Sequence, residues 1–267
     1  MKKRKRRNIK INAALLCIVL IIMGYFITSI ITYATTETLP IVCTDANLYN
    51  KLTETLPKEY ILSKDASTKT INIKEENLAN ITKLTLSGSD ITSINGLQVL
   101  SYLSELDISD NSISSINDLN SLSNLQKLNV SNNLITSVTP ISILTKLTEL
   151  NVSSNRISDI TALSNLTNLT ILDLSVNSIS NVSTIQRLTK LKTLNLSQNS
   201  NVTNIDDTLQ SSLISLNLSG TGIKKIKQNV ADEKALITQN CTNLEELYLS
   251  DTNITDIYQL FDTKTVW

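Results

Sequence analysis

The sequence predicts an α/β solenoid, a curved stack of short repeats with a parallel β-sheet on its concave face and short helical or 3-10 turns on its convex face. Three observations predict it. A 22-residue pattern of apolar residues recurs along most of the chain, an asparagine recurs within that pattern, and a short amphipathic helix precedes the first copy. Only 5 glycines and 3 prolines are present, so asparagine and serine are expected to make the turns.

The repeats share the frame L-x-x-L-x-L-x-x-N-x-I-x-x-I-x-x-L-x-x-L-x-x, which defines a repeat domain at 81–267. Its eight copies begin at Ile81, Leu103, Leu125, Leu147, Leu169, Leu191, Leu213 and Leu244. The L-x-L pair predicts a short strand with two inward side chains, and the later apolar positions, three residues apart, predict a tight outer turn. One repeat cannot bury its apolar side alone, so neighbours must stack and share a core.

The ninth position of the frame is predicted to be structural. It is asparagine in five consecutive copies: Asn111, Asn133, Asn155, Asn177 and Asn199. Backbone groups in the turn after the strand lack sheet partners, and a side-chain amide offers both donors and an acceptor to satisfy them. We therefore predict an asparagine ladder along the solenoid. Ser89, Thr221 and Thr252 occupy this position in the outer copies.

Residues 35–80 are predicted to form a linker and a cap over the first repeat. Residues 35–43 are interpreted as a brief linker, and 58–80 as a transitional half-repeat in which Ile71 and Ile73 alternate as in a strand. A cap is needed because the first repeat of an array otherwise exposes its core.

The cap is expected to contain a short helix. Thr44 or Asp45 is a suitable N-cap, and Pro57 ends the segment. Between them, one apolar stripe repeats every four residues and consists of Leu48, Leu52 and Leu56.

The first 34 residues predict export. Residues 1–10 carry seven basic side chains and are expected to stay in the cytoplasm, and 11–34 are an uncharged apolar run. Such a run is long enough to span a bilayer. Two outcomes remain open: an uncut transmembrane signal anchor, which the length of the run favours, or a signal peptide cleaved after Ala34.

Composition argues against several functions. The chain has no histidine, which removes the usual general base and the commonest metal ligand. No glycine-rich phosphate loop is present, so we expect no enzymatic activity, catalytic residue, metal, cofactor or small-molecule substrate. After the basic leader, 17 basic and 24 acidic residues remain, which argues against nucleic acid as a partner. Of the three cysteines, Cys17 is expected to be an apolar residue of the leader, and Cys43 and Cys241 are expected to be buried or free thiols.

With these features in view, the chain resembles the internalin-type leucine-rich repeats of bacterial surface proteins. The resemblance covers about residues 41–260. It is based on the 22-residue period, on the leader, and on segments such as ITKLTLSGSDITSINGL (81–97) and LTELNVSSNRISDITALSNL (147–166). It implies a right-handed leucine-rich-repeat solenoid that binds protein partners through its concave face. No immunoglobulin-like module and no LPxTG motif follow the repeats in this sequence.

The outward strand positions are the predicted binding surface. Binding hot spots favour tryptophan, tyrosine and arginine. Among the outward positions, Tyr248 is one such residue, and Ile171 and Val176 form a small apolar island. The candidates for binding are Glu105, Asp107, Ile171, Asp173, Val176 and Tyr248. The prediction is an extracytoplasmic module for protein binding or adhesion at the bacterial cell surface. The alternative is a structural spacer, or a fragment of a larger envelope protein, with no specific ligand of its own.

Two segments depart from the frame. The last step between repeats is longer than the others because of extra residues within 227–243, which lie either on the binding side or in a lengthened outer helix. The chain then ends with FDTKTVW. Three alternatives remain open there: Phe261 and Trp267 fold back over the last repeat, the end contacts a partner, or the sequence is a fragment.

Overall fold

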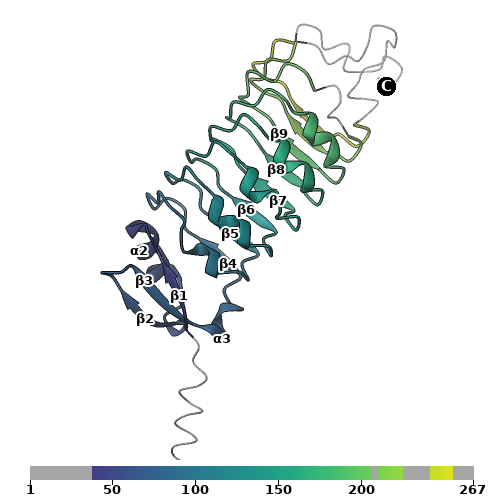
Figure 1. Ribbon diagram of the computed structural model, residues 1–267. Helices are drawn as coiled ribbons and strands as arrows, with labels where there is room; N and C mark the ends of the chain where they lie inside the picture. The colour runs from purple at the N-terminus through teal and green to yellow at the C-terminus, as the bar shows by residue number, and fades with distance from the viewer. Residues whose placement is uncertain (1–37, 206–209, 225–240, 255–267) are drawn as a thin grey trace, which may run out of the picture.

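The computed structural model describes residues 38–205, 210–224 and 241–254, which are the coloured parts of Figure 1. The predicted leader and the two irregular segments named above lie largely or wholly outside these ranges. Within them, no helix is both long enough and apolar enough to cross a membrane.

The repeats form one eight-stranded parallel sheet, as the frame predicts (Figure 1). The strands are β4 (Lys83–Thr85), β5 (Glu105–Asp107), β6 (Lys127–Asn129), β7 (Glu149–Asn151), β8 (Ile171–Asp173), β9 (Thr193–Asn195), β10 (Ser215–Asn217) and β11 (Glu246–Tyr248). They follow one another in chain order, and each pairs in register, so that Leu84 lies opposite Leu106 and Leu106 opposite Leu128. Equivalent positions of neighbouring repeats therefore form straight rows across the sheet.

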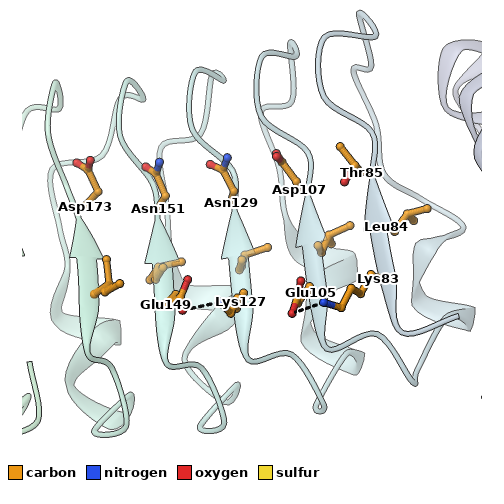
Figure 2. A pocket seen from close by; sticks show the side chains of 14 residues that line it. Lys83, Leu84, Thr85, Glu105, Asp107, Lys127, Asn129, Glu149, Asn151 and Asp173 are labelled. Carbon is orange, nitrogen blue, oxygen red and sulfur yellow. Dashed lines mark ion pairs between the residues drawn. The ribbon is translucent and has the colours of Figure 1, made fainter. Parts of the chain in front are cut away.

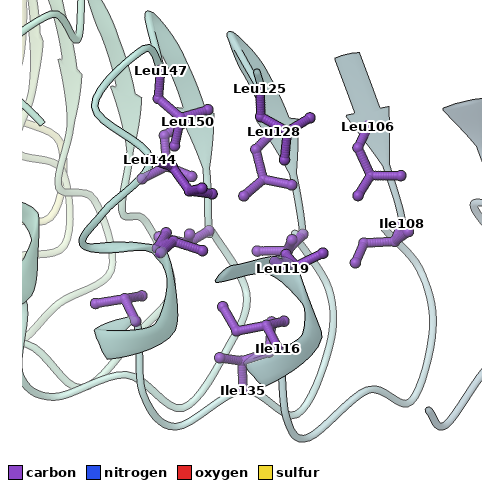
Figure 3. Packing of buried hydrophobic residues seen from close by; sticks show 14 of the residues in the cluster. Leu106, Ile108, Ile116, Leu119, Leu125, Leu128, Ile135, Leu144, Leu147 and Leu150 are labelled. Atoms are coloured by element: carbon purple, nitrogen blue, oxygen red, sulfur yellow. The ribbon is translucent and has the colours of Figure 1, made fainter. Parts of the chain in front are cut away.

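Short 3-10 turns lie on the side opposite the sheet. They are η2 (Leu97–Val99), η3 (Asn117–Ser121), η4 (Thr139–Ile141), η5 (Thr161–Asn165) and η6 (Ser183–Arg187). Figure 3 shows apolar side chains filling the space between these turns and the strands. Leu106, Ile108 and Leu119 are each at most 2% exposed, and the same core continues from repeat to repeat.

The cap contains a small antiparallel sheet, in the order β1-β3-β2. Its strands are β1 (Thr38–Val42), β2 (Ile61–Asp65) and β3 (Thr70–Lys74), with η1 (Lys58–Tyr60) before β2 and α3 (Glu75–Leu78) after β3. The interpretation of residues 35–43 as a linker is therefore wrong for 38–42. Ile41 of β1 pairs with Ile71 of β3, and both are fully buried. Pairing with β3 buries Ile41, and this burial stabilises residues 38–42 as a strand.

The predicted cap helix is confirmed as α2 (Ala46–Thr55), and its N-cap is Asp45. One carboxylate oxygen of Asp45 accepts a hydrogen bond from the backbone N–H of Leu48 at 2.9 Å. The other oxygen accepts from the backbone N–H and the hydroxyl of Thr92, at 2.8 and 2.6 Å. Since Thr92 lies in the first repeat, a single carboxylate joins the cap to the array.

The sixth repeat departs from the frame. The eleventh and fourteenth positions are Asn201 and Asn204, but the side chains that enter the core are those of Val202 and Ile205, one residue later. The neighbouring repeat accommodates this change at Gly222, where a Cβ atom would overlap the carbonyl oxygen of Ser200. The shift is a local insertion that the 22-residue spacing conceals.

Candidate functional site

A groove of about 480 Å³ crosses the strands β4 to β8 on the exposed face of the sheet. Figure 2 shows its labelled polar and charged side chains in two parallel rows. The third-position row consists of Lys83, Glu105, Lys127, Glu149 and Ile171, and the fifth-position row consists of Thr85, Asp107, Asn129, Asn151 and Asp173. We call this feature the sheet groove.

The charges of the third-position row alternate and pair. Lys83 Nζ lies 2.9 Å from Glu105 Oε1, and Lys127 Nζ lies 2.6 Å from Glu149 Oε1. The hydrogen bond and the charge of Glu149, with a smaller contribution from Glu105, raise the pKa of Lys127. Exposed pairs of this kind add little stability. Their effect on the groove is that four charges cancel along its N-terminal part.

Ile171 ends this row of charges. Its side chain is 42% exposed, at a position where the four preceding strands present lysine or glutamate. An exposed β-branched residue therefore follows directly after a run of neutralised charges.

The fifth-position row organises the turns that follow the strands. In β5, Asp107 Oδ1 accepts from the backbone N–H of Ser109 at 3.0 Å and from its hydroxyl at 2.7 Å. The same side-chain turn links Asn129 to Ser131 and Asp173 to Ser175. Asparagine and aspartate commonly close turns in this way. This pairing was not identified from the sequence, although the spacing Asp/Asn-x-Ser was the signal.

Asp107 and Asp173 differ in whether their second carboxylate oxygen already accepts a hydrogen bond from the protein. The second oxygen of Asp173 accepts a hydrogen bond from the side-chain amide of Asn195 at 3.1 Å. The second oxygen of Asp107 accepts from no protein group in the described part of the chain. Asp107 is therefore the carboxylate of this row that has a vacant acceptor.

The eighth position of every repeat has a positive φ angle. The residues there are Gly88, Asp110, Asn132, Ser154, Val176, Gln198, Gly220 and Asp251. Glycine, asparagine and aspartate tolerate this region, but a β-branched side chain is strained in it. Val176, with φ of 53°, is the β-branched member, and its side chain is 48% exposed.

The predicted binding residues do not form one patch. Glu105, Asp107, Ile171 and Asp173 line the sheet groove. Val176 lies in the turn after β8, and Tyr248 lies in β11, three strands beyond β8 in the sheet order. Asn129 and Asn151 line the groove but were not among the predicted candidates.

The ninth-position asparagines lie beneath the turns and bond across repeats. In Asn155, the amide nitrogen donates to the carbonyl oxygens of Val130, Val152 and Ser153 at 2.9 to 3.1 Å. Its side-chain oxygen accepts from the backbone N–H of Ile135 at 2.9 Å. The other four ladder asparagines, Asn111, Asn133, Asn177 and Asn199, make the corresponding bonds.

Residues suited to metal or covalent chemistry are sparse in this part of the chain. No group of three or more acidic or cysteine side chains in the described ranges is arranged to hold a metal ion. Cys43 and Cys241 are buried free thiols. Burial raises the pKa of each to about 11, so both remain protonated at neutral pH and are poor nucleophiles.

Family comparisons agree with the repeat frame. Three family models match the chain. The model described as Leucine Rich repeats (2 copies) matches residues 123–165, and the one described as Leucine rich repeat matches 145–200. A further Leucine Rich repeat model matches 240–257. Comparison with curated protein sequences gave no match.

Solved structures similar to this chain include internalins of Listeria monocytogenes. Internalin C2 of strain 4b F2365 has a TM-score of 0.67 and 26% identity, over 84% of this chain and 92% of that one. The functional domain of InlJ, which includes a cysteine ladder, has a TM-score of 0.59 and 29% identity, over 71% of this chain. The match spans only 39% of the InlJ chain.

A third internalin supports the fold alone. The protein inlF of the same strain has a TM-score of 0.54 at 24% identity, over 82% of this chain and 74% of that one. The repeat families and the in-register sheet show that the chain is a leucine-rich-repeat solenoid, and its likeness to internalin C2 and InlJ makes it similar to the internalin-type repeats of bacteria.

Proposed function

We propose that this protein is an extracytoplasmic protein-binding module of the bacterial cell surface, and that Ile171 is the central anchor of its binding face. The internalin likeness supports protein binding as the general role. The observation that carries the proposal for this chain is the exposed Ile171 in the sheet groove.

Ile171 has the surroundings of a binding anchor. Binding energy concentrates in a few apolar or aromatic residues near the centre of an interface, within a polar rim. Ile171 lies in the sheet groove between Glu149 on β7 and Thr193 on β9. Glu149 is already paired with Lys127, so a partner that covers Ile171 leaves no unpaired charge at Glu149.

Val176 supports the same location. It belongs to the same repeat, 169–190, and replaces the turn-forming residues of the other repeats with an exposed, strained valine. Strained backbone is found preferentially at functional sites, where the strain is retained for a purpose. Two departures from the pattern, Ile171 and Val176, thus expose apolar surface on one repeat.

The leader supports a location outside the cytoplasm. Seven basic residues followed by the apolar run 11–34 direct the remaining chain across the membrane, either as an anchor or as a cleaved signal peptide. N-terminal sequencing of the mature protein tests this. A start at Thr35 establishes cleavage, a start at the first residues establishes an anchor, and retention of the repeat domain in the cytoplasm contradicts the localisation.

Site-specific photocrosslinking tests the binding face. A photoreactive amino acid at position 171 is expected to capture a partner in living cells. The matched control is Gln186, an exposed residue of the outer turn η6 in the same repeat. Capture at 171 but not at 186, with loss of the adduct when Val176→Asp is added, is the expected result. Capture at neither position favours a spacer without a specific ligand.

A further inference from the structure

We infer that the sheet groove recognises an extended polypeptide segment through its main-chain carbonyl groups, with a basic side chain at Asp107 and an apolar side chain at Ile171. This inference rests on the proposed function and adds the form and the chemistry of the partner. It follows from which groups of the fifth-position row are already hydrogen-bonded and which are left available.

The side-chain amides of Asn129 and Asn151 are oriented so that their nitrogen atoms remain available as hydrogen-bond donors. The side-chain oxygen of Asn129 accepts from the N–H and hydroxyl of Ser131 at 3.1 and 2.8 Å, and that of Asn151 accepts from Ser153 at 2.9 and 2.7 Å. Fixing the oxygen also fixes the amide nitrogen, which bonds to no protein group in the described ranges. Figure 2 shows both side chains in one row with Asp107 and Asp173.

The two donors lie close enough to contact one polypeptide segment together. Asn129 and Asn151 lie opposite each other on neighbouring strands, which are about 4.8 Å apart. A segment that crosses the strands in extended form presents unpaired carbonyl oxygens along its length. A helix does not, because its carbonyls are bonded within the helix. The two amides therefore select an extended segment over a helical one.

The charges around Asn129 and Asn151 determine which kind of hydrogen-bond acceptor their amides can bind. The two neutral donors lie between the carboxylates of Asp107 and Asp173 in the same row. An anionic ligand placed between these carboxylates would be repelled by both. A neutral carbonyl oxygen is not repelled, and the vacant oxygen of Asp107 favours a lysine or arginine of the same segment.

The distance between the two ends sets the spacing within the partner. Asp107 is on β5 and Ile171 on β8, three strand spacings apart, or about 14 Å across the sheet. Ile171 also lies two residues, or about 7 Å, away along the strand direction, because Asp107 is in register with Asp173, so the two positions are about 16 Å apart. An extended chain advances about 3.4 Å per residue, and every second side chain points to the same face. The basic and the apolar residue of the segment should therefore be roughly four positions apart, the even separation nearest to this distance.

Synthetic peptides test this spacing on the full chain in detergent micelles. The probes are fluorescent twelve-residue peptides of alanine, serine and threonine that contain one arginine and one leucine, separated by two, four, six or eight positions in either order. Fluorescence anisotropy is expected to show the tightest binding at a separation of four, weakened at least about fivefold at two or eight. Binding independent of the separation overturns the inference.

Asparagine-to-aspartate substitutions test the two donors. Asn129→Asp and Asn151→Asp keep the oxygen that accepts from the turn serine, as Asp107 and Asp173 do naturally, but remove the amide donors. Each is expected to weaken binding of the arginine–leucine peptide roughly tenfold. The added negative charge would by itself strengthen attraction of the arginine, so a loss of affinity reports the missing donor.

Asn217→Asp is the matched control. Asn217 makes the same turn bond, to the backbone N–H of Ser219 at 3.0 Å, but lies on β10 and does not line the groove. Its substitution should leave peptide affinity unchanged. Circular dichroism and the urea unfolding midpoint establish that all three variants are folded.

The outcomes separate the inference from the proposed function. If photocrosslinking at position 171 captures a partner while no peptide binds, or while the two aspartate variants capture that partner as well as the wild type, the groove binds a folded surface and the inference is wrong. The protein-binding function then stands. If position 171 captures nothing and no peptide binds, the proposed function fails with it.

Discussion

The repeats that begin between Ile81 and Leu169 differ from the later repeats in how their turns are held. In the first five, the asparagine of the following repeat accepts a hydrogen bond from a backbone N–H in the turn, as Asn199 does from Ile179 at 3.0 Å. The seventh repeat has Thr221 instead, whose hydroxyl donates to Leu218 of its own repeat at 2.6 Å. The ninth-position side chain therefore hydrogen-bonds to the turn of the preceding repeat in the first region, but only within its own repeat at Thr221.

The difference shows what keeps the repeats in register. The apolar positions shift by one residue in the sixth repeat, at Val202 and Ile205, where the ladder ends. The next turn accommodates the shift by means of Gly222 beneath Ser200. The shift begins directly after Asn199, the last ladder asparagine. The ladder is therefore associated with a fixed placement of the apolar positions within each repeat.

The largest effect is expected from removing one ladder residue. Asn155→Ala leaves three carbonyl groups and one N–H without their side-chain partner, which should cost about 4 kcal/mol of unfolding free energy. Thr221→Ala removes one hydrogen bond and should cost about 1 kcal/mol. Urea unfolding followed by circular dichroism measures both. Equal losses would remove the distinction between the two regions.

Glycine substitutions probe the irregular region next. In Gly222→Ala the new Cβ meets the carbonyl oxygen of Ser200, so overpacking should cost about 3 kcal/mol. Gly88→Ala is the control, because nothing lies within 4 Å of its Cβ. Its φ of +59° alone should cost about 1–2 kcal/mol. Thermal unfolding measures both variants. A smaller loss of stability for Gly222→Ala than for Gly88→Ala would mean that the backbone of the sixth repeat moves readily to accommodate the new Cβ.

The stability that Asp45 gives to the contact between the cap and the first repeat should depend on pH. Burial by itself raises the pKa of Asp45, but hydrogen bonds from Thr92 and from the backbone of Leu48 and Thr92 lower it overall. Because the folded pKa lies below the unfolded value of about 3.9, the stabilisation is present above that value. It is lost as pH falls through the folded pKa.

Asp45→Asn measures this contribution. The variant keeps an acceptor for Leu48 but loses the one for Thr92, so it should be less stable by about 1–2 kcal/mol at pH 7. The difference from the wild type should shrink as the pH is lowered from about 5 to below 3. A constant difference across this range would show that the charge of Asp45 does not hold the cap.

The smallest effect is a gain. Val176→Asn relieves a β-branched residue at φ of 53° and should stabilise the protein by about 1 kcal/mol. The reverse change, Asn132→Val, should destabilise it by a similar amount. If Val176 contacts a partner, the more stable variant should bind more weakly in the same crosslinking assay. Unchanged capture would assign the valine no part in binding.

The sequence was sufficient for features that repeat and insufficient for features that occur once. Eight aligned copies predict the parallel sheet, because each position recurs in the same environment. Strand β1 was missed because Ile41 is buried only through pairing with Ile71, 30 residues away in the chain. The shift at Val202 was hidden because the total repeat length is unchanged.

The candidate site was only partly accessible from the sequence. Outward positions followed from the strand period, which identified Asp107 and Ile171. The sequence does not show which oxygen of an aspartate is occupied, so Asp173 was ranked with Asp107 although Asn195 already uses its second oxygen. Asn129 and Asn151 were passed over because their role depends on the turn bonds that orient their amides.

The in-register pairing of identical units has a consequence for how such proteins diversify. Deleting residues 125–146, one whole repeat, would join the repeat of β5 to that of β7 with every row preserved, because the two boundaries occupy the same place in the frame. Asp107 and Ile171 would then lie one strand closer, by about 4.8 Å. Unequal recombination between repeats can thus change partner preference in discrete steps, here by shortening the distance between Asp107 and Ile171 and by removing Asn129 from the groove.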